Sequence, residues 1–470
     1  MRFVLFFTPG ALNTGADLAD VPSGLATVLS ALQGFLPSSP KQATSVDKTP
    51  ERELRCPARR PARSKETGMS ANSNRIPVPL LPESTRVAME IHGGSQGRFP
   101  RGDVILLGTG DPSFITPEHI REAAKRAIDD GRTHYERRAD LQEAIADKLW
   151  ADNGIRVHPT DGVVLAHGAH QAIFQTFQAL VNPGDEVLLA TPGSYFESNT
   201  LVRGAIPVYV PLRPERQFRI DPDDVAARIT PRTRFLCVTV PEAPAGSVHT
   251  REDLLRLAEL ARRHNLIVFS DELYEKINFG RVPHTSIGSL PGMAERTITI
   301  NGLSKAWAMT GWRVGWCAGP THLMAPIAAI AHMNNISLSA PAYWAGVAAL
   351  RGPQDVVGQM VAAYQRKMGD LLDRITAIPG LRAQFPDGTY YLWTDVRETG
   401  LDEMAFTALA QSEGVRVNPG TAFGPGGAGF VRLSCSPSEA QIEEGTRRLA
   451  RAVARAASER GTSAVVAASS

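Results

Sequence analysis

The sequence predicts an α/β fold, with a mainly parallel β-sheet covered by helices on both faces and a smaller second domain towards the C-terminus. Three observations support this prediction. Short apolar runs alternate with amphipathic helical stretches from about Asp103 onward. After about Pro320 the chain becomes mainly helical, up to about Ala377. Two later apolar runs, Tyr390–Asp395 and Gly429–Ser434, are typical of strands in a second domain.

Six apolar runs are the predicted strands of the main sheet. They are Val163–Leu165, Val187–Ala190, Val208–Val210, Phe235–Val240, Leu266–Ser270 and Thr297–Ile300. Between the fourth and the fifth run, the segment Thr250–His264 has apolar residues at helical spacing, with Thr250 as a candidate N-cap. Strand–helix–strand units of this kind build a parallel sheet, whose ligands bind at the carboxyl ends of the strands. We therefore expect the functional residues directly after the apolar runs.

Composition and charge exclude several classes of protein. The 470 residues carry 50 Lys and Arg against 48 Asp and Glu, a net charge of +2, which argues against binding nucleic acid through bulk charge. No apolar run approaches the roughly 20 residues that a membrane-spanning helix needs. The four cysteines are too far apart in sequence for a metal or redox motif, and buried free thiols suit a reducing cytoplasm. We thus expect a cytoplasmic protein with no metal site and with neither nucleic acid nor membrane as a partner.

Both ends of the chain differ from its regular centre. Residues 1–68 include a stretch rich in Pro, Ser, Arg and Lys, Pro37–Gly68, that has neither a helix nor a strand period. We predict that this N-terminal extension is disordered, and Met69 is a plausible alternative start of the chain. The last residues, 461–470, are small and are expected to form a flexible tail.

The strongest candidate for chemistry is Lys305, which lies just past a predicted strand in the stretch NGLSKAWAMTGWRVGWCAG, Asn301–Gly319. A single lysine is ordinarily a solvated surface residue, but apolar residues such as Leu303 and Trp307 flank this one. A lysine shielded from water has a lowered pKa and can form a Schiff base with an aldehyde. Arg313, eight residues on, would supply a fixed positive fork for a phosphate. An amine nucleophile beside a phosphate-binding arginine is what pyridoxal 5′-phosphate requires.

A second candidate stretch is LIVFSDELY, Leu266–Tyr274, in which Asp271 ends an apolar run. An Asp at such a place is commonly a helix cap. Alternatively, Asp271 has a functional role as a buried carboxylate. It would keep a pyridine nitrogen protonated, so that the ring becomes an electron sink for a carbanion. Tyr274, three residues on, would then donate to the phenolic oxygen of that ring.

Two further stretches are weaker when taken alone. Gly168, Ala169 and His170 lie between a predicted strand and a predicted helix, where backbone N–H groups form a ready phosphate site. Many strand–helix turns contain glycine, however, so this signal has low specificity. Arg432 lies in the middle of the predicted strand GFVRLS, and such a buried charge is either part of a structural ion pair or a carboxylate receptor. When Arg432 is considered without the other stretches, a structural ion pair is the commoner role for such a buried arginine.

Together and in this order, the four stretches resemble the class I/II aminotransferases of fold type I, over roughly Arg75 to Ala454. The stretch from Lys305 to Arg313 is highly specific for that family. Further matching motifs are LGTGDPSF (Leu107–Phe114), VNPGDEVLLATP (Val181–Pro192), PDGTYYLW (Pro386–Trp393) and VNPGTAFGPGG (Val417–Gly427).

The resemblance implies an architecture and an assembly. It implies a large domain with a mostly parallel seven-stranded sheet at 116–325, which binds pyridoxal phosphate. A smaller α+β domain would follow at 326–460, and an N-terminal arm at 69–115 would contribute to it. Members of this family are homodimers with shared active sites, so Tyr135 would reach the phosphate that the partner subunit binds.

The resemblance also assigns roles to the candidate residues. Lys305 would carry the Schiff base, with Asp271 on the pyridine nitrogen and Tyr274 on the phenolic oxygen. The residues assigned to the phosphate are Gly168, Ala169, His170, Ser304 and Arg313. Gly110 and Arg432 would hold the carboxylate of the substrate.

Several residues depart from the family pattern. The turn Ala243–Gly246 stands where the family has an Asn-Pro-Thr-Gly-like turn, so the Asn that normally donates to the phenolic oxygen is missing. Glu242 either approaches the cofactor or is solvated, and we expect it to be solvated. The ring that stacks on the pyridine is displaced, because the aligned residue is Ser194 and the nearest ring is Tyr195. The loop after Tyr135 is short and lacks the usual glycine.

The sequence therefore supports one leading function and two alternatives. The leading function is an aminotransferase that acts on an amino acid and a 2-oxo acid, with Lys305 as Schiff-base former and proton shuttle. The departures at Ala243, at Ser194 and in the loop after Tyr135 leave open a lyase, cyclase or substitution enzyme that uses the same cofactor. A transcription regulator on the same fold would need an N-terminal winged-helix domain, for which residues 1–68 are too short and too rich in proline.

Overall fold

The structure is a computed structural model of the chain, and it describes residues 82–92, 103–193 and 196–468. The predictions for residues 1–68, for Ser194 and for Tyr195 fall outside these ranges. All that follows concerns the unit Pro77–Ser470. Each helix in the described part of the chain is too short or too polar to cross a bilayer.

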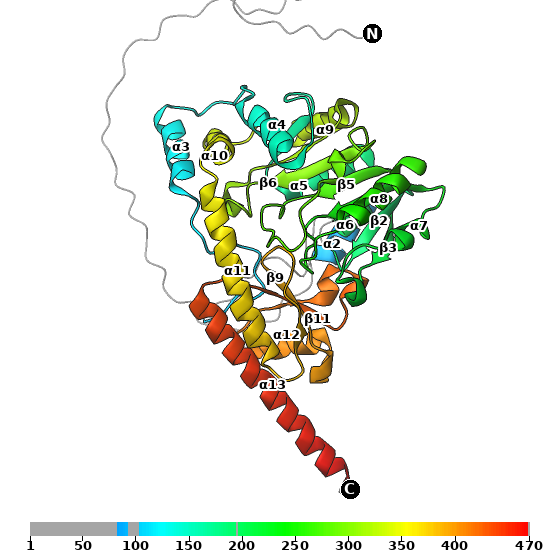
Figure 1. Ribbon diagram of the computed structural model, residues 1–470, viewed down its shortest axis with the longest axis vertical. Helices are drawn as coiled ribbons and strands as arrows, with labels where there is room; N and C mark the ends of the chain where they lie inside the picture. The colour runs from blue at the N-terminus through cyan, green and yellow to red at the C-terminus, as the bar shows by residue number, and fades with distance from the viewer. Residues whose placement is uncertain (1–81, 93–102, 194–195, 469–470) are drawn as a thin grey trace, which may run out of the picture. The chain divides into compact units, whose positions relative to one another are not determined.

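A seven-stranded sheet forms the centre of the larger domain (Figure 1). Its strands are β1 (Val163–Ala166), β2 (Glu186–Thr191), β3 (Ile206–Pro211), β4 (Thr233–Thr239), β5 (Ile267–Asp271), β6 (Thr297–Gly302) and β7 (Gly315–Ala318). Their order is β1-β7-β6-β5-β4-β2-β3, and only β7 runs antiparallel to its neighbours. The mostly parallel seven-stranded sheet is thus confirmed. The six predicted strands form β1 to β6, and β7 is an addition to them.

Helices cover both faces of this sheet. On one face lie α5 (Ala169–Leu180), α6 (Phe196–Val202) and α9 (Thr321–Asn334), and on the other lie α7 (Pro222–Ala226) and α8 (Arg251–Arg263). Strand β4 shows why the apolar runs are continuous: Phe235 and Cys237 belong to one hydrophobic cluster, whereas Leu236 and Val238 belong to the other. The predicted cap of α8 is confirmed, because the Thr250 side chain accepts a hydrogen bond from the Asp253 N–H at 3.1 Å.

A third group of helices packs against the β1 edge of the sheet. It consists of α3 (Glu118–Asp129), α4 (Asp140–Asn153) and α10 (Ala340–Arg351), and its core includes the buried Trp307 and Trp316. The short helix α2 (Glu83–His92) contacts α6. Cys237, Cys317 and Cys435 are buried free thiols, as expected.

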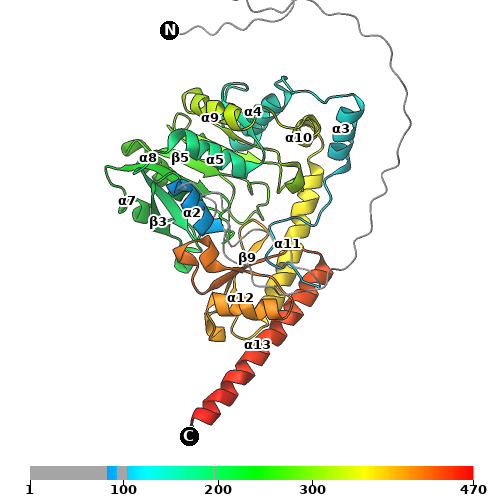
Figure 2. The same ribbon diagram turned by 180° about the vertical axis from the view of Figure 1, so that it is seen from behind.

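The smaller domain, where Figure 2 labels β9 beside α11 and α12, contains a four-stranded antiparallel sheet in the order β10-β11-β9-β8. Its elements are α11 (Asp355–Thr376), β8 (Arg382–Ala383), β9 (Tyr391–Asp395), α12 (Glu403–Ser412), β10 (Asn418–Pro419), β11 (Phe430–Ser434) and α13 (Glu439–Ala468). The two strands predicted here are confirmed as β9 and β11. Helix α13 extends through most of the segment 461–470 that was expected to be a flexible tail, because its alanine-rich sequence favours helix.

The segment before α3 connects the smaller domain to the main sheet. Ile105 forms a β-bridge with Val415, and the Gly108 N–H donates to the Arg416 carbonyl at 2.9 Å. The Ser434 N–H donates to the carbonyl of Leu107 at 2.7 Å. These bonds fix the segment along β11 and place the next residues, up to Gly110, beside the turn that follows β6.

Candidate active site

Lys305 lies in the turn after β6, where its flanking residues Leu303, Trp307 and Met309 are buried. Its Nζ donates to the carbonyl of Gly110 at 2.6 Å, across 195 residues of sequence. Burial lowers the pKa of the Lys305 amine, the charges of Arg432 and Arg313 lower it further, and Tyr391 and Asp111 act in the opposite direction. The amine is therefore shielded from water, as its apolar flanks predict, and it loses its proton more readily than a surface lysine does.

Three tyrosine rings surround this amine. The centroids of the Tyr274 and Tyr390 rings lie 5.8 and 5.9 Å from Lys305 Nζ. The Tyr390 hydroxyl donates to the Gly110 carbonyl at 2.6 Å, so it shares an acceptor with the lysine. The Tyr274 hydroxyl lies 2.8 Å from the Tyr391 hydroxyl. Tyr274 was expected here, but sequence reasoning took Tyr390 and Tyr391 only as part of a matching motif and assigned them no role.

Asp271 ends β5, the neighbour of β6 in the sheet, and its side chain is buried. Its Oδ1 accepts a hydrogen bond from the Leu273 N–H at 3.1 Å. Burial raises the pKa of Asp271 to about 7, and the nearby carboxylates of Glu242 and Glu272 contribute to that rise. The Leu273 N–H and the charge of Lys305 act in the opposite direction. A cation placed against Asp271 would stabilise its ionised form.

Glu242 is buried, with 1% of its surface exposed, so the expectation that it is solvated was wrong. The turn that carries it folds inward, because the Glu242 N–H donates to the Ser247 carbonyl and the Gly246 N–H donates to the Glu242 carbonyl, both at 2.8 Å. Glu242 Oε1 lies 3.3 Å from Nε2 of His249. The Ile220 N–H donates to Nδ1 of the same ring at 3.3 Å, which leaves the proton of the neutral imidazole on Nε2, facing Glu242.

The charge of the buried Glu242 affects Asp271. Its charge is one of the causes that raise the pKa of Asp271, whereas Lys305 is affected by other groups. Burial raises the pKa of Glu242 as well, and the hydrogen bond with His249 opposes this rise. Two carboxyl groups that face each other without water do not ionise together readily.

An anion cradle lies at the N-terminus of α5. Gly168 is the N-cap, at φ 80°, and a Cβ on it would lie only 2.5 Å from Arg313 Nη2. The Arg313 guanidinium donates to the carbonyls of Thr310 at 2.9 Å and His167 at 3.3 Å. The glycine therefore allows the guanidinium to approach the helix N-terminus, where backbone N–H groups and a positive dipole favour an anion.

The other residues predicted to bind the phosphate lie near this cradle. Ala169 opens α5, with His170 next to it, and Ser304 is buried beside Lys305. A Cβ on Gly302 would lie 3.6 Å from the Ala169 nitrogen, so the end of β6 adjoins the start of α5. The structure thus brings together all five residues predicted for the phosphate.

Arg432 lies on β11 and is 7% exposed. Its guanidinium stacks on the Tyr391 ring, 4.0 Å from the centroid, and donates to the Gly108 carbonyl at 2.9 Å. Its Nε is buried without a hydrogen-bond partner in the structure. The structural ion pair considered from sequence does not form among the described residues. Such a buried, incompletely satisfied guanidinium is suited to receive a carboxylate.

Gly110 and Tyr135 occupy different environments. A Cβ on Gly110 would lie 2.6 Å from the Tyr391 hydroxyl, which a larger residue would therefore crowd, and 3.8 Å from Lys305 Nζ. Tyr135 lies in the loop between α3 and α4 with 62% of its surface exposed. The structure therefore places Gly110 within the lysine cluster, whereas Tyr135 faces outward from this subunit.

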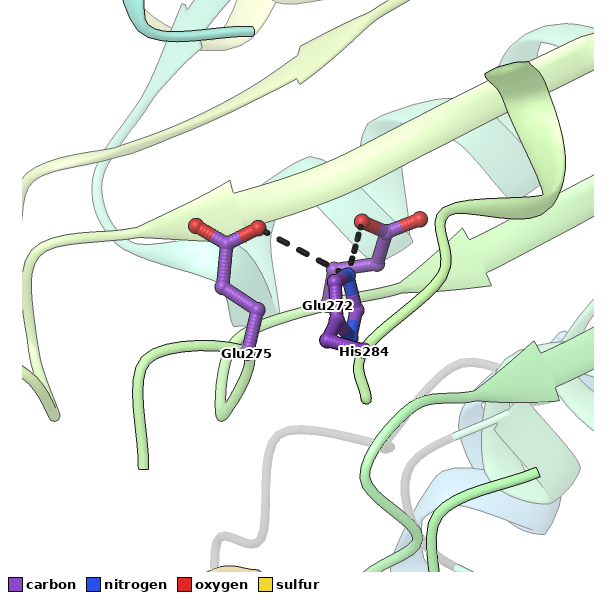
Figure 3. Close-up of side chains that lie close together, drawn as sticks. All are labelled: Glu272, Glu275 and His284. Atoms are coloured by element: carbon purple, nitrogen blue, oxygen red, sulfur yellow. Dashed lines mark hydrogen bonds and ion pairs between the residues drawn. The ribbon is translucent and has the colours of Figure 1, made fainter. Parts of the chain in front are cut away.

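The turn after Asp271 is supported by a buried polar cluster of Glu272, Glu275 and His284 (Figure 3). His284 Nε2 lies 3.1 Å from Glu272 and 3.9 Å from Glu275. Lys148 forms an ion pair with Glu275, and the Asn153 amide donates to Glu272 at 3.1 Å and to Glu275 at 2.5 Å. Because Lys148 pairs with Glu275 and His284 pairs with Glu272, we assign this cluster to holding the turn that carries Asp271 and Tyr274.

Comparison with known proteins agrees with this geometry. Residues 102–449 match the family described as aminotransferase class I and II. The aspartate aminotransferase of Pyrococcus abyssi is 37% identical over 387 residues, which is 81% of this chain and 97% of that protein. The arginine–pyruvate transaminase of Pseudomonas aeruginosa is 40% identical and covers 77% of this chain and 93% of its own length.

A solved structure shows the same relationship. The aromatic aminotransferase from Pyrococcus horikoshii superposes with a TM-score of 0.73 at 37% sequence identity, over 75% of this chain and 96% of that one. The match extends over both sheets, at an identity high enough to show common descent as well as a common fold. The chain therefore belongs to the class I and II aminotransferases, enzymes of fold type I that use pyridoxal 5′-phosphate to transfer an amino group.

Proposed function

We propose that this aminotransferase binds pyridoxal phosphate at Lys305 and transfers the amino group of an amino acid to a 2-oxo acid at that place. One observation carries the proposal. The shielded amine of Lys305 lies between a buried carboxylate, Asp271, and an anion cradle at Arg313, close enough for each charge to interact with the lysine. When bound, the cofactor supplies an aldehyde for amines and a ring that withdraws electrons.

The groups around Lys305 fit each part of this cofactor. The Gly168–Arg313 cradle would hold the phosphate, since a Cβ on the glycine would fill it. Asp271 would hold the protonated ring nitrogen, and that cation would offset the cost of a buried carboxylate. Tyr274 would donate to the phenolic oxygen from its place beside the lysine.

Lys305 would have two tasks. Its amine would bind the aldehyde of the cofactor, and as a free amine it would take and return the proton of the substrate Cα. The lowered pKa of Lys305 serves both tasks, because a larger fraction of the amine is unprotonated near neutral pH. The Gly110 carbonyl, 2.6 Å from Nζ, orients the amine for this work.

Arg432 would bind the carboxylate of the substrate, and its replacement should affect substrate rather than cofactor. We expect Arg432→Gln to raise KM for both the amino acid and the 2-oxo acid by roughly 10-fold to 100-fold, since a charged hydrogen bond is worth about 1.5–3 kcal/mol. Cofactor content should be unchanged. Steady-state kinetics with absorbance of the bound cofactor measure both quantities, and an unchanged KM would contradict the assignment.

The presence of Ala243 in place of the donor Asn leads to a prediction about the pKa of the bound cofactor. Ala243 is 4% exposed and lies in the same hydrophobic cluster as Tyr274. With the donor Asn absent, the unprotonated form of the bound cofactor has one fewer hydrogen bond to its phenolic oxygen. Ala243→Asn should therefore lower, by about one unit, the pKa that a visible absorbance titration reports. An unchanged or raised value would show that another group already takes the place of the Asn.

A panel of amino acids tests the proposed reaction directly. The purified enzyme is mixed with each amino acid, and the cofactor spectrum is followed together with release of the 2-oxo acid. Conversion of the cofactor to its amine form with equal release of 2-oxo acid supports transamination. Products formed without the amine form of the cofactor would favour a lyase, cyclase or substitution reaction.

Two further features complete the proposal. The active enzyme would be a homodimer in which Tyr135, exposed in the single subunit, reaches the phosphate of the partner's site. The chain would be cytoplasmic, which the three buried free thiols support, because a reducing compartment keeps cysteines unpaired.

A further inference from the structure

Tyr391 belongs to the same buried cluster as Ala243, the residue that replaces the family's usual second donor. The Tyr391 hydroxyl is 2.8 Å from the Tyr274 hydroxyl, the remaining donor to the phenolic oxygen under the proposed function. Tyr391 opens β9 and is 2% exposed. A Cβ on Gly110 would lie only 2.6 Å from this hydroxyl and 3.8 Å from Lys305 Nζ, so the hydroxyl lies close to the lysine amine. It is thus a buried polar group inside the lysine cluster to which the roles assigned so far give no task.

The pairing of β9 with β11 fixes the place of this ring. Arg432 is opposite Trp393, and Tyr391 lies two residues before Trp393, so the arginine and the tyrosine share a face of the small sheet. The Arg432 guanidinium stacks on the Tyr391 ring at 4.0 Å. The hydroxyl is therefore held at a fixed place by its strand and by a stacked cation, and it does not depend on a flexible loop.

The protons of the three hydroxyl groups can be assigned from these contacts, since each hydroxyl has one proton to donate. Tyr390 uses its proton on the Gly110 carbonyl at 2.6 Å. Between Tyr274 and Tyr391 either hydroxyl is able to donate to the other. If Tyr274 donated to Tyr391, it would have no proton left for the phenolic oxygen of the cofactor.

We propose that Tyr391 is a positioning residue that acts through Tyr274: its hydroxyl donates to the Tyr274 hydroxyl and so directs the single Tyr274 proton to the phenolic oxygen of the cofactor. This inference rests on the proposed function, because it requires the cofactor at Lys305. The two hydrogen bonds form a chain in which each strengthens the other. Tyr391 thereby restores part of the stabilisation that Ala243 cannot give.

The charges around Tyr391 favour this direction of donation. Burial, the largest single cause, would raise the pKa of the Tyr391 hydroxyl, but the positive charges of Arg432 and Lys305 act against it, and the pKa of Tyr391 is lowered overall. A hydroxyl beside positive charges is a better donor, and the phenolic oxygen of the cofactor, which would carry negative charge, is a stronger acceptor for the Tyr274 proton than a neutral hydroxyl.

The test compares two substitutions that each remove one buried hydroxyl. Tyr391→Phe removes the hydroxyl in question and leaves a ring on which Arg432 can stack. Tyr364→Phe is the matched control, because the Tyr364 hydroxyl is buried without a partner and its ring packs on Tyr390 at 5.2 Å. In a visible absorbance titration of the bound cofactor, Tyr391→Phe should raise the pKa by about half a unit. Tyr364→Phe should titrate like the unmodified enzyme.

The same titration in a Tyr274→Phe background decides whether Tyr391 acts through Tyr274. We expect Tyr391→Phe to add no further shift there, because the chain is already broken. An equal shift in both backgrounds would mean a direct contact with the cofactor and would overturn the positioning role, as would a Tyr391→Phe titration identical to that of the control. If the unmodified enzyme forms no borohydride-reducible adduct at Lys305, the proposed function itself fails.

Discussion

Replacement of Lys305 by alanine should abolish the yellow, borohydride-reducible adduct with the cofactor and nearly all turnover. Alanine has no amine to bind the aldehyde or to take and return the proton of the substrate Cα. The loss of proton transfer alone is expected to reduce kcat by roughly 10²-fold to 10⁴-fold. Mass spectrometry of the borohydride-reduced, unmodified protein should place the cofactor on the peptide that contains Lys305.

Lys367 provides the matched control for this experiment. It too is buried, at 7% exposure, with a lowered pKa caused first by burial. Its amine donates to the Ser436 carbonyl at 3.2 Å and lies near the rings of Phe114 and Tyr364, away from the carboxylate and the anion cradle of the site. Lys367→Met should therefore keep the adduct. Finding the reduced cofactor on Lys367, or on any lysine other than Lys305, would refute the assignment.

Much of the fold could be predicted because the main sheet is buried on both faces. Strands such as β4 and β5 alternate between two hydrophobic clusters, so nearly every residue is apolar and the run is visible in the sequence. Strand β7 was not among the predicted runs. It has only four residues and lies within the stretch Asn301–Gly319, where the candidate residues Lys305 and Arg313 interrupt the apolar pattern.

The site was less predictable, because its contacts connect distant parts of the chain. The Gly110 carbonyl that accepts from Lys305 and from Tyr390 lies 195 and 280 residues away from them. Tyr391 is held in place by the stacked guanidinium of Arg432, which lies on another strand. Apolar flanks could indicate that Lys305 is shielded, but no local pattern shows which carbonyl or hydroxyl it meets.

Glu242 shows why a rule about single residues fails. A glutamate in a turn of proline and alanine is solvated by default, since a buried carboxylate is costly. The burial of Glu242 depends on His249, whose proton is directed to it by the Ile220 N–H. That arrangement needs three segments to meet, and only the structure shows it. The burial of Glu242 affects Asp271, because the charge of Glu242 helps to raise the pKa of Asp271.

Asp271→Asn should lower kcat of the enzyme with bound cofactor but raise the stability of the cofactor-free enzyme. With cofactor, the substitution removes the carboxylate that pairs with the ring nitrogen. Breaking a buried ion pair by removing one partner costs about 3–5 kcal/mol, which corresponds to a fall in kcat of roughly 10²-fold to 10⁴-fold. Cofactor should still be found on Lys305, because its amine and the anion cradle are unchanged.

Without cofactor, the same substitution should stabilise the protein above neutral pH. The pKa of Asp271 rises from 3.8 to about 7 on folding, chiefly through burial, so its contribution to stability is complete below pH 3.8 and is lost as pH increases through 7. Above pH 7 the native protein must hold an ionised carboxylate beside Glu242 and Glu272, at a cost of up to about 4 kcal/mol by linkage. An amide of the same shape avoids that cost, so the cofactor-free variant should melt at a higher temperature at pH 8, and the advantage should decrease towards pH 4.

Asp387→Asn is the control for this stability measurement. Asp387 is also buried, but it forms an ion pair with Arg219 at 2.9 Å, so neutralising it leaves a guanidinium without its partner and should lower the melting temperature. The two substitutions make the same chemical change and are expected to shift the melting temperature in opposite directions. If Asp271→Asn instead destabilises the cofactor-free protein at pH 8, a cation of the protein already pairs with Asp271. The Asp271 carboxylate would then not be available to pair with the ring nitrogen of pyridoxal phosphate.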